Sequence, residues 1–81
     1  MKILMTRAAR RDYQNLAPQL KARVAKQLGL LVDNPHHPSL RAKKFDEAND
    51  VWQARVTRSY RFYFTIVADT YAILRITEHP K

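Results

Sequence analysis

The chain of 81 residues contains no cysteine, which excludes a disulfide framework and a thiolate metal site. This absence fits a reducing compartment, and we expect a cytoplasmic protein. No apolar run reaches the roughly 18 residues of a membrane span, and the N-terminus lacks the apolar core of a signal peptide. One glycine and four prolines argue against a disordered chain. We therefore expect a single domain over residues 1–81, without a membrane segment.

Acidic residues are also scarce, because seven Asp and Glu stand against 15 Lys and Arg, for a formal net charge of +8. So high a charge on a small chain attracts anionic partners, such as nucleic acid, an acidic protein or an anionic membrane surface. Basic residues recur along the whole sequence. The charge therefore does not belong to a separate tail.

Residues 51–66 alternate apolar and polar side chains with period two, which predicts two half-buried antiparallel strands. The apolar parity consists of Trp52, Ala54, Val56, Phe62, Phe64 and Ile66. A three-residue loop between the strands puts all of these on one face, with Trp52 opposite Phe64. The same register sets Arg55 opposite Arg61, a repulsive pair that either splays into solvent or awaits an anion.

The N-terminal half predicts a strand and two helices. Residues 2–5 can form a short strand, and Thr6 can cap a helix whose apolar stripe is Ala8, Ala9, Tyr13 and Leu16. Pro18 suits the first turn of a second helix, which ends at Asn34-Pro35. The adjacent His36 and His37 lack further ligands at metal-site spacing, so we expect a plain loop there, with no metal site and no cofactor.

Two further strands are expected on either side of the hairpin, at residues 40–45 and 71–77, with a three-residue loop at 68–70 before the last one. Residues 46–50 form a polar, acidic connection. If Ala72, Leu74 and Ile76 share the core, parity sets the pairing of the last two strands. The expected pairs are Ile66 with Ala72, Tyr63 with Arg75, and Arg61 with Thr77.

The predicted fold class is α+β, with the N-terminal strand and helical hairpin packed on one face of a small, mainly antiparallel twisted sheet. The other sheet face stays open. We expect it to carry Gln53, Arg55, Arg61, Tyr63, Thr65, Arg75 and Thr77, with His79 at its edge and Lys43 and Lys44 nearby.

Such a face suits phosphate, because arginine forks match phosphate oxygens bidentately and tyrosine stacks on bases. RNA cleavage by its own 2′-hydroxyl needs a base, positive groups around the phosphoryl centre and an acid. The positive groups would be Arg55, Arg61 and Arg75. Proton transfer is open to His79, Tyr63, Lys43, Lys44, Lys81, Asp46 and Glu47. A solvated sheet face in a basic protein explains the same residues equally well.

The order and spacing of these segments resemble the RelE/ParE superfamily of bacterial toxin–antitoxin toxins. The resemblance covers nearly the whole chain and rests on LLVDNPHHPSL, RAKKF, VWQARVTRSYRFYF and ILRITEH. It implies a small endoribonuclease that cuts mRNA in the ribosomal decoding site without a metal and is silenced by a cognate antitoxin. Arg61 matches the strand arginine of the family, Arg55 a basic position on the preceding strand, and His79 a late histidine. We count Lys43, Lys44, Gln53, Tyr63 and Lys81 as RNA-binding candidates.

Two departures from the family pattern keep other functions open. Gln53 stands where a partner lysine is found in relatives, and the sequence stops two residues after His79, without a C-terminal tyrosine or helix. The alternatives are a non-nuclease toxin that binds DNA gyrase and a non-toxic basic interaction module of the same fold.

Overall fold

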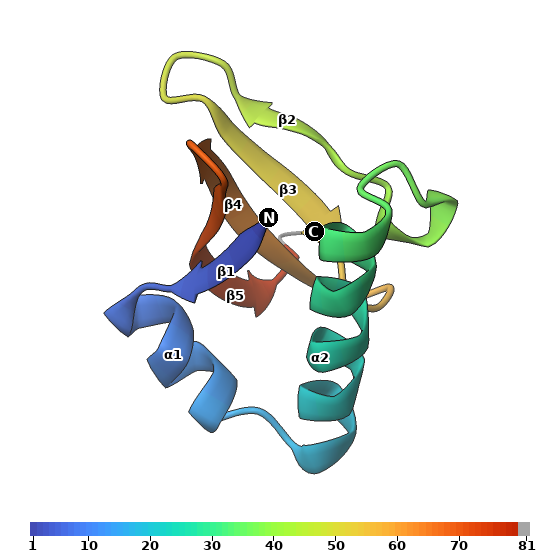
Figure 1. Ribbon diagram of the computed structural model, residues 1–81. Helices are drawn as coiled ribbons and strands as arrows, with labels where there is room; N and C mark the ends of the chain where they lie inside the picture. Colours follow the sequence, from blue (N-terminus) through green and yellow to red (C-terminus); the bar gives the residue numbers. More distant parts are fainter. Residues whose placement is uncertain (80–81) are drawn as a thin grey trace.

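The computed structural model describes residues 1–79, and in this range the chain forms one five-stranded sheet, two α-helices and a short 3-10 helix (Figure 1). The elements are β1 (Lys2–Met5), α1 (Arg7–Gln14), α2 (Pro18–Asp33), η1 (Pro38–Leu40), β2 (Lys43–Asp46), β3 (Val51–Arg55), β4 (Tyr60–Val67) and β5 (Thr70–Glu78). The strand order is β1-β5-β4-β3-β2, with β1 parallel to β5 and the other pairs antiparallel. The predicted α+β architecture is confirmed.

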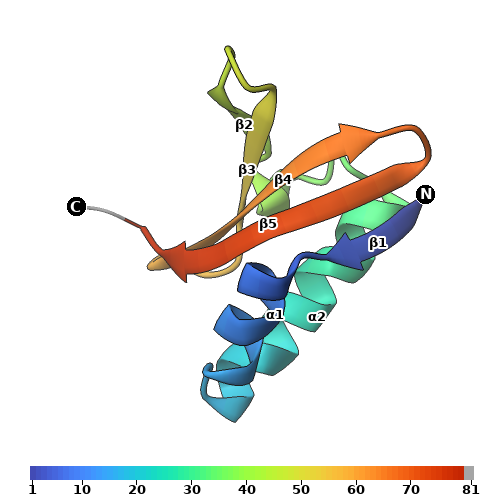
Figure 2. The same cartoon turned by 90° about the vertical axis from the view of Figure 1, so that its left-hand side faces the viewer.

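Both helices lie on the same side of the twisted sheet (Figure 2). The Thr6 side chain caps α1 as predicted, accepting a hydrogen bond of 3.1 Å from the Ala9 N–H. Ala9 is buried in the core, but Ala8 is exposed and does not belong to the apolar stripe. Pro18 opens α2, whose buried residues are Val24, Gln27 and Leu31. Neither helix within the described residues is long and apolar enough to cross a membrane.

The β3–β4 hairpin has the register that parity predicts. Trp52 lies opposite Phe64, with ring centroids 6.4 Å apart, and Arg55 lies opposite Arg61. Phe62 is fully buried at the centre of the core. Trp52 is only half-buried, so it forms the margin of the core. Alternation alone therefore placed this hairpin, because one buried face tolerates no one-residue slip.

The predicted register of β4 and β5 is wrong near the turn between them. The connection is a two-residue turn with Ala68 at φ 54°, in the left-handed region, instead of a three-residue loop. Ile66 consequently pairs with Tyr71 and not with Ala72. The core takes Tyr71 and Ile73 in place of the predicted Ala72 and Leu74.

A bulge at Leu74 then restores the predicted pairing farther along β5. The register shifts between Tyr63 and Phe64, so that Tyr63 faces Arg75 and Arg61 faces Thr77. One extra residue in β5 reverses the parity once more. The residues from Arg75 onward therefore lie where the sequence predicts, although those before the bulge do not.

The strand expected at residues 40–45 begins later than predicted. Residues 38–40 form η1, in which Leu40 is buried, and β2 runs over Lys43–Asp46. Leu40 thus contributes to the core from a 3-10 turn rather than from a strand. The cause is Pro38, whose fixed φ favours the first turn of a helix.

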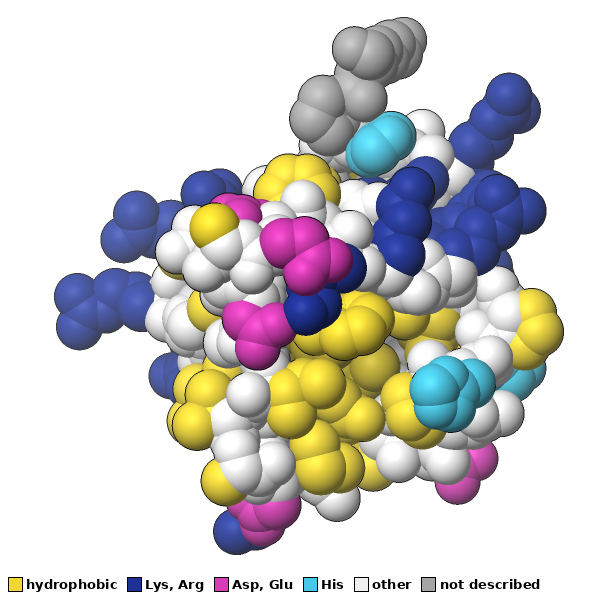
Figure 3. Space-filling model, turned by 90° about the horizontal axis from the view of Figure 1, so that it is seen from above, with side chains coloured by type: hydrophobic (Ala, Val, Ile, Leu, Met, Phe, Trp, Pro, Cys, Tyr) yellow, Lys and Arg dark blue, Asp and Glu magenta, His cyan; other side chains and the backbone are white. Residues whose placement is uncertain are grey.

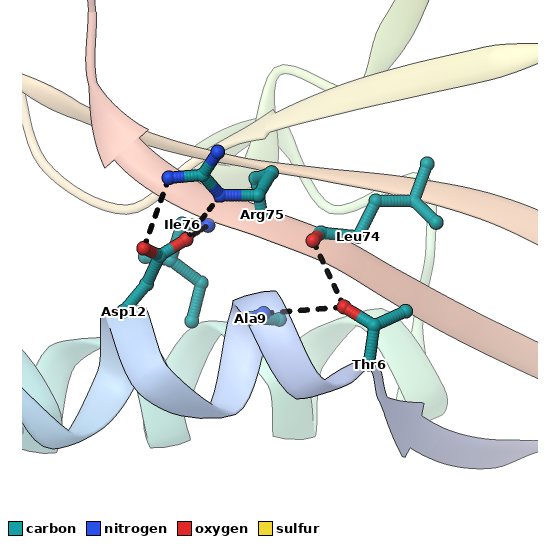
Figure 4. A network of polar contacts seen from close by, with 6 residues as sticks. All are labelled: Thr6, Ala9, Asp12, Leu74, Arg75 and Ile76. Atoms are coloured by element: carbon teal, nitrogen blue, oxygen red, sulfur yellow. Dashed lines mark hydrogen bonds and ion pairs between the residues drawn. The ribbon is translucent and has the colours of Figure 1, made fainter.

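α1 closes the edge of β5 where β1 ends (Figure 4). The Thr6 hydroxyl donates to the Leu74 carbonyl at 2.9 Å, and the Asp12 carboxylate accepts the Ile76 N–H at 2.9 Å. The same carboxylate accepts two hydrogen bonds from Arg75, from Nε at 2.7 Å and Nη2 at 3.1 Å. Backbone groups next to the bulge, which would otherwise be an open strand edge, are satisfied in this way.

Asp12→Asn should lower stability at neutral pH by about 1 kcal/mol, because a charge-assisted contact to the strand edge is lost. The hydrogen bond from Arg75 holds the pKa of Asp12 below its usual value, against burial, which raises it. A carboxyl with a depressed folded pKa stabilises the fold above its unfolded pKa of about 3.9 and loses this contribution as pH falls through the folded pKa.

The difference between parent and Asp12→Asn in free energy of unfolding should therefore shrink as the pH falls below about 3.9. Urea unfolding between neutral and acid pH measures it. A difference that stays constant across this range would show that the Asp12 charge does not hold the β5 edge.

Candidate nucleic-acid interface

We call the sheet face opposite the helices the open face; its residues are Lys43, Gln53, Arg55, Arg61, Tyr63, Thr65, Arg75 and Thr77. They form two rows across the strands. One row runs from Arg55 through Arg61 to Thr77, and the other runs from Lys43 through Gln53 and Tyr63 to Arg75.

Arg55 is the most crowded charge of the first row. Its partial burial lowers its pKa, and the charges of Arg41, Arg61, Arg58 and Arg23 lower it further. An arginine stays protonated even so. The charge of Arg55 is therefore retained in a repulsive setting, which an anion would relieve.

Arg61 is bound by the turn that connects β3 and β4. Its Nη1 donates to the carbonyls of Thr57 at 2.6 Å and Tyr60 at 3.0 Å, with Arg58 O at 3.3 Å. These carbonyls accept hydrogen bonds from the guanidinium of Arg61, whose charge was expected either to splay into solvent or to await an anion. Arg61 thus has a structural contact at Nη1, while none of its other guanidinium nitrogens makes a hydrogen bond within the described residues.

His79 lies against the same turn, because its backbone N–H donates to the Ser59 carbonyl at 2.5 Å. His79 is exposed to solvent. The structure thereby brings His79 to the end of the row formed by Arg55, Arg61 and Thr77. Lys81, the last RNA-binding candidate, lies outside the described residues.

The second row is more apolar than the sequence predicts. Phe45 of β2 packs against Tyr63, with ring centroids 4.8 Å apart at 58°. Gln53 is only 7% exposed, and its Oε1 has no hydrogen-bond partner in the part of the chain that the structure describes. Gln53 therefore belongs to the open face by its position in β3, but its side chain is nearly inaccessible to solvent. Sequence reasoning missed Phe45, whose side chain reaches this face because β2 is irregular after Lys44.

Two of the predicted basic site residues, Arg75 and Lys44, form ion pairs with carboxylates. Arg75 is on the open face as predicted, but it is paired with Asp12 of α1. Lys44 pairs with Trp52 in the sheet and lies 4.7 Å from its ring centroid, on the face toward the helices. A hydrogen bond from its ammonium group to Asp50 raises the pKa of Lys44. Both lysines were expected near the open face; β2 places Lys43 on that face and turns Lys44 to the opposite one, because successive strand residues face opposite sides.

Two hollows adjoin the sheet. One, of about 380 Å³, is mainly apolar and lies between the C-terminal end of α2 and the sheet, with Trp52, Phe64, Tyr71 and His37 in its wall. Seen from above, apolar side chains gather in the middle of this face beside histidines, and Lys and Arg side chains lie on both sides of them (Figure 3). The second, of about 370 Å³, lies beside Arg55. No group of three or more potential metal ligands occurs among residues 1–79.

Comparison with known proteins places these features in a family context. A family model for the ParE toxin of type II toxin–antitoxin systems matches residues 3–80. The RelBE2 toxin–antitoxin complex from Mycobacterium tuberculosis contains a chain 28% identical, with 96% of each chain covered and a TM-score of 0.76.

More distant solved structures share the fold. A YoeB/ParE toxin from Agrobacterium tumefaciens is 15% identical over 99% of this chain and 100% of its own, with a TM-score of 0.83. The RelBE toxin–antitoxin complex from Escherichia coli has a chain 12% identical, over 99% of this chain and 98% of its own, with a TM-score of 0.73. No curated protein sequence matches significantly.

Arg61→Ala should lower the melting temperature by about 4–8 °C, the shift expected for a net loss of 1 kcal/mol in a domain of this size. The reason is that the turn carbonyls lose their donor. Thermal melting followed by circular dichroism measures the shift, with Arg10→Ala, an exposed arginine of α1, as the matched control. A higher melting temperature for Arg61→Ala would mean that repulsion from Arg55 outweighs the turn contacts.

Proposed function

This chain belongs to the ParE toxin family of type II toxin–antitoxin systems, within the RelE/ParE superfamily, and we propose that it is an endoribonuclease that cleaves mRNA on the ribosome. The observation that carries the proposal is the row of Arg55, Arg61 and Thr77 on the open face, with His79 at its end. The two arginines have no carboxylate partner among the described residues.

The chemistry that this row suits is attack by the RNA 2′-hydroxyl on the adjacent phosphate. The 2′-oxygen forms a bond to phosphorus, the bond to the 5′-oxygen breaks, and a cyclic phosphate remains. Arg55 and Arg61 would stabilise the added charge on the phosphoryl oxygens. One group takes the 2′-proton and another protonates the 5′-oxygen. Among the proton-transfer candidates, His79 adjoins this row and Tyr63 lies on the same face.

The second row would hold the strand. The Tyr63–Phe45 pair exposes aromatic surface on which a base can stack, and Phe45 is 59% exposed. Lys43, in the same row, would contact a phosphate. Arg75 is ion-paired with Asp12, so we assign it a role in positioning the edge of β5 and not in contacting the phosphoryl group. Lys44 and Gln53, which face inward or lie buried, would contribute little to RNA contact.

The chain's regulator would be a cognate antitoxin protein. Related toxins from Mycobacterium tuberculosis, Staphylococcus aureus and Pyrococcus horikoshii were solved as toxin–antitoxin complexes. The +8 charge favours an antitoxin segment with acidic residues, because opposite charges steer association.

A second candidate function, binding of DNA gyrase without nuclease activity, is favoured by two observations on the open face. Gln53 is uncharged and buried where a cation would face RNA, and Arg61 already binds the turn carbonyls. In this case the arginines would support the fold instead of the chemistry.

Primer extension on mRNA from cells that express the protein separates the two functions. Discrete cuts within translated messages support the nuclease. Intact messages together with DNA damage support the gyrase-binding toxin and contradict the proposed cleavage.

Arg55→Gln should reduce ribosome-dependent cleavage by roughly 10²–10³, the loss found when one preorganised donor is removed from such a site. Its fold should persist, because relief of the arginine repulsion offsets the lost contacts. Cleavage of a ribosome-bound message by purified protein is the measurement, and Arg10→Gln removes the same charge from α1 as a control. Parental rates in a folded Arg55→Gln protein would remove Arg55 from the chemistry.

A further inference from the structure

A polar cleft opens where α2, η1 and the β3–β4 turn meet. It measures about 370 Å³ and is lined by Arg23, Arg41, Arg55, Arg58, Ser39 and Thr57, together with Pro38. Among residues 1–79, no acidic and no aromatic side chain lines it. We call it the arginine cleft; of its residues only Arg55 also belongs to the open face.

The positive charge of the arginine cleft is uncompensated. Within residues 1–79 the ion pairs engage Lys2, Lys44 and Arg75, and none reaches the cleft. The Nε–H of Arg23 donates a hydrogen bond to the Val56 carbonyl at 3.0 Å, which holds this guanidinium at the wall of the cleft. The charges of Arg41, Arg58 and Arg23 all lower the pKa of Arg55, which means that these guanidinium groups repel one another across the cleft. An anion bound among them would lower the electrostatic free energy.

The backbone of Arg41 is strained. Arg41 follows η1 with φ 45° and ψ 41°, a left-handed conformation that favours glycine. In this conformation the backbone N–H of Arg41 donates a hydrogen bond to the Pro38 carbonyl at 3.2 Å. An arginine in a position suited to glycine is the pattern expected when the side chain has a task.

The walls of the cleft are tied together from inside the protein. Gln27 of α2 is 1% exposed, and its Nε2 donates to the carbonyls of Arg55 at 2.8 Å and Ser39 at 3.3 Å. This amide joins the end of β3 to η1 and to α2. The backbone of Arg55 and of Ser39, on two sides of the cleft, is therefore held in place by α2.

We propose that the arginine cleft binds a backbone phosphate of an RNA strand, at a site distinct from the phosphate that is cut. Guanidinium forks bind phosphate oxygens in pairs, and the absence of aromatic side chains suits a phosphate contact rather than base recognition. Arg55 reaches both surfaces, so one strand can continue from the cleft onto the open face. The choice of RNA as ligand rests on the proposed function, whereas the choice of a phosphate rests on the cleft alone.

The test uses a 2′-O-methyl RNA oligonucleotide, which cannot undergo 2′-hydroxyl cleavage, so binding is measured without turnover. Arg41→Gly and Arg58→Gln should each weaken binding several-fold, and should reduce the slope of log affinity against log salt by about 0.7. Arg10→Gln serves as the control for loss of one charge. Arg41→Gly should melt no lower than the parent, because glycine relieves the left-handed strain.

A second measurement uses inorganic phosphate at constant ionic strength, with chloride as the reference anion. Phosphate should raise the melting temperature of the parent more than that of Arg41→Gly. Equal shifts for both proteins, or parental RNA affinity and salt slope in both cleft variants, would overturn the assignment. Weakened binding of an acidic antitoxin segment with unchanged RNA binding would overturn it too and reassign the cleft to a protein partner.

The outcomes also separate this inference from the proposed function. A parent that binds the oligonucleotide through the cleft but cuts no message supports the cleft and contradicts cleavage. A parent that cuts messages while both cleft variants bind RNA normally supports cleavage and contradicts the cleft.

Discussion

The bulge at Leu74 is the constraint on which both the core and the open face depend. Before it, Tyr71 and Ile73 face the core; after it, Ile76 does. Residues 73 and 76 differ by an odd number, so no regular strand could bury both on one face. The extra residue also turns Thr77 to the open face, in line with Arg61. The contacts of α1 with Leu74 and Ile76 hold this irregular edge, and the row that ends at His79 depends on it.

Sequence reasoning succeeded where one pattern allowed one answer. The β3–β4 register followed from alternation, and Thr6 and Pro18 marked the helix starts. It failed in β5, because the segment from Tyr71 to Ile76 carries apolar residues on both parities, and alternation could not choose between them. Contacts between distant segments were equally inaccessible, such as the pairing of Asp12 with Arg75, 63 residues apart.

The positions of the candidate residues followed from the sequence more than their surroundings did. Arg55, Arg61 and Thr77 form the expected row, but the turn carbonyls around Arg61 and the ring of Phe45 depend on side-chain placement. The arginine cleft combines residues from α2, η1 and the β3–β4 hairpin, which only the fold brings together. Carboxylates pair with Lys44 and Arg75, whereas the arginines around Arg55 form no ion pair within residues 1–79, and their charge can steer a polyanion.

The central claim is that the open face promotes attack by the RNA 2′-hydroxyl on its neighbouring phosphate. The most direct test is cleavage of a ribosome-bound message that carries a single 2′-deoxynucleotide immediately before the scissile phosphate. The account predicts that this message stays intact, that the all-ribose message is cut to leave a 5′-hydroxyl, and that a chelator leaves cutting unchanged. Cleavage of the deoxy-substituted message at the same phosphate would contradict the account, because another nucleophile would then be at work.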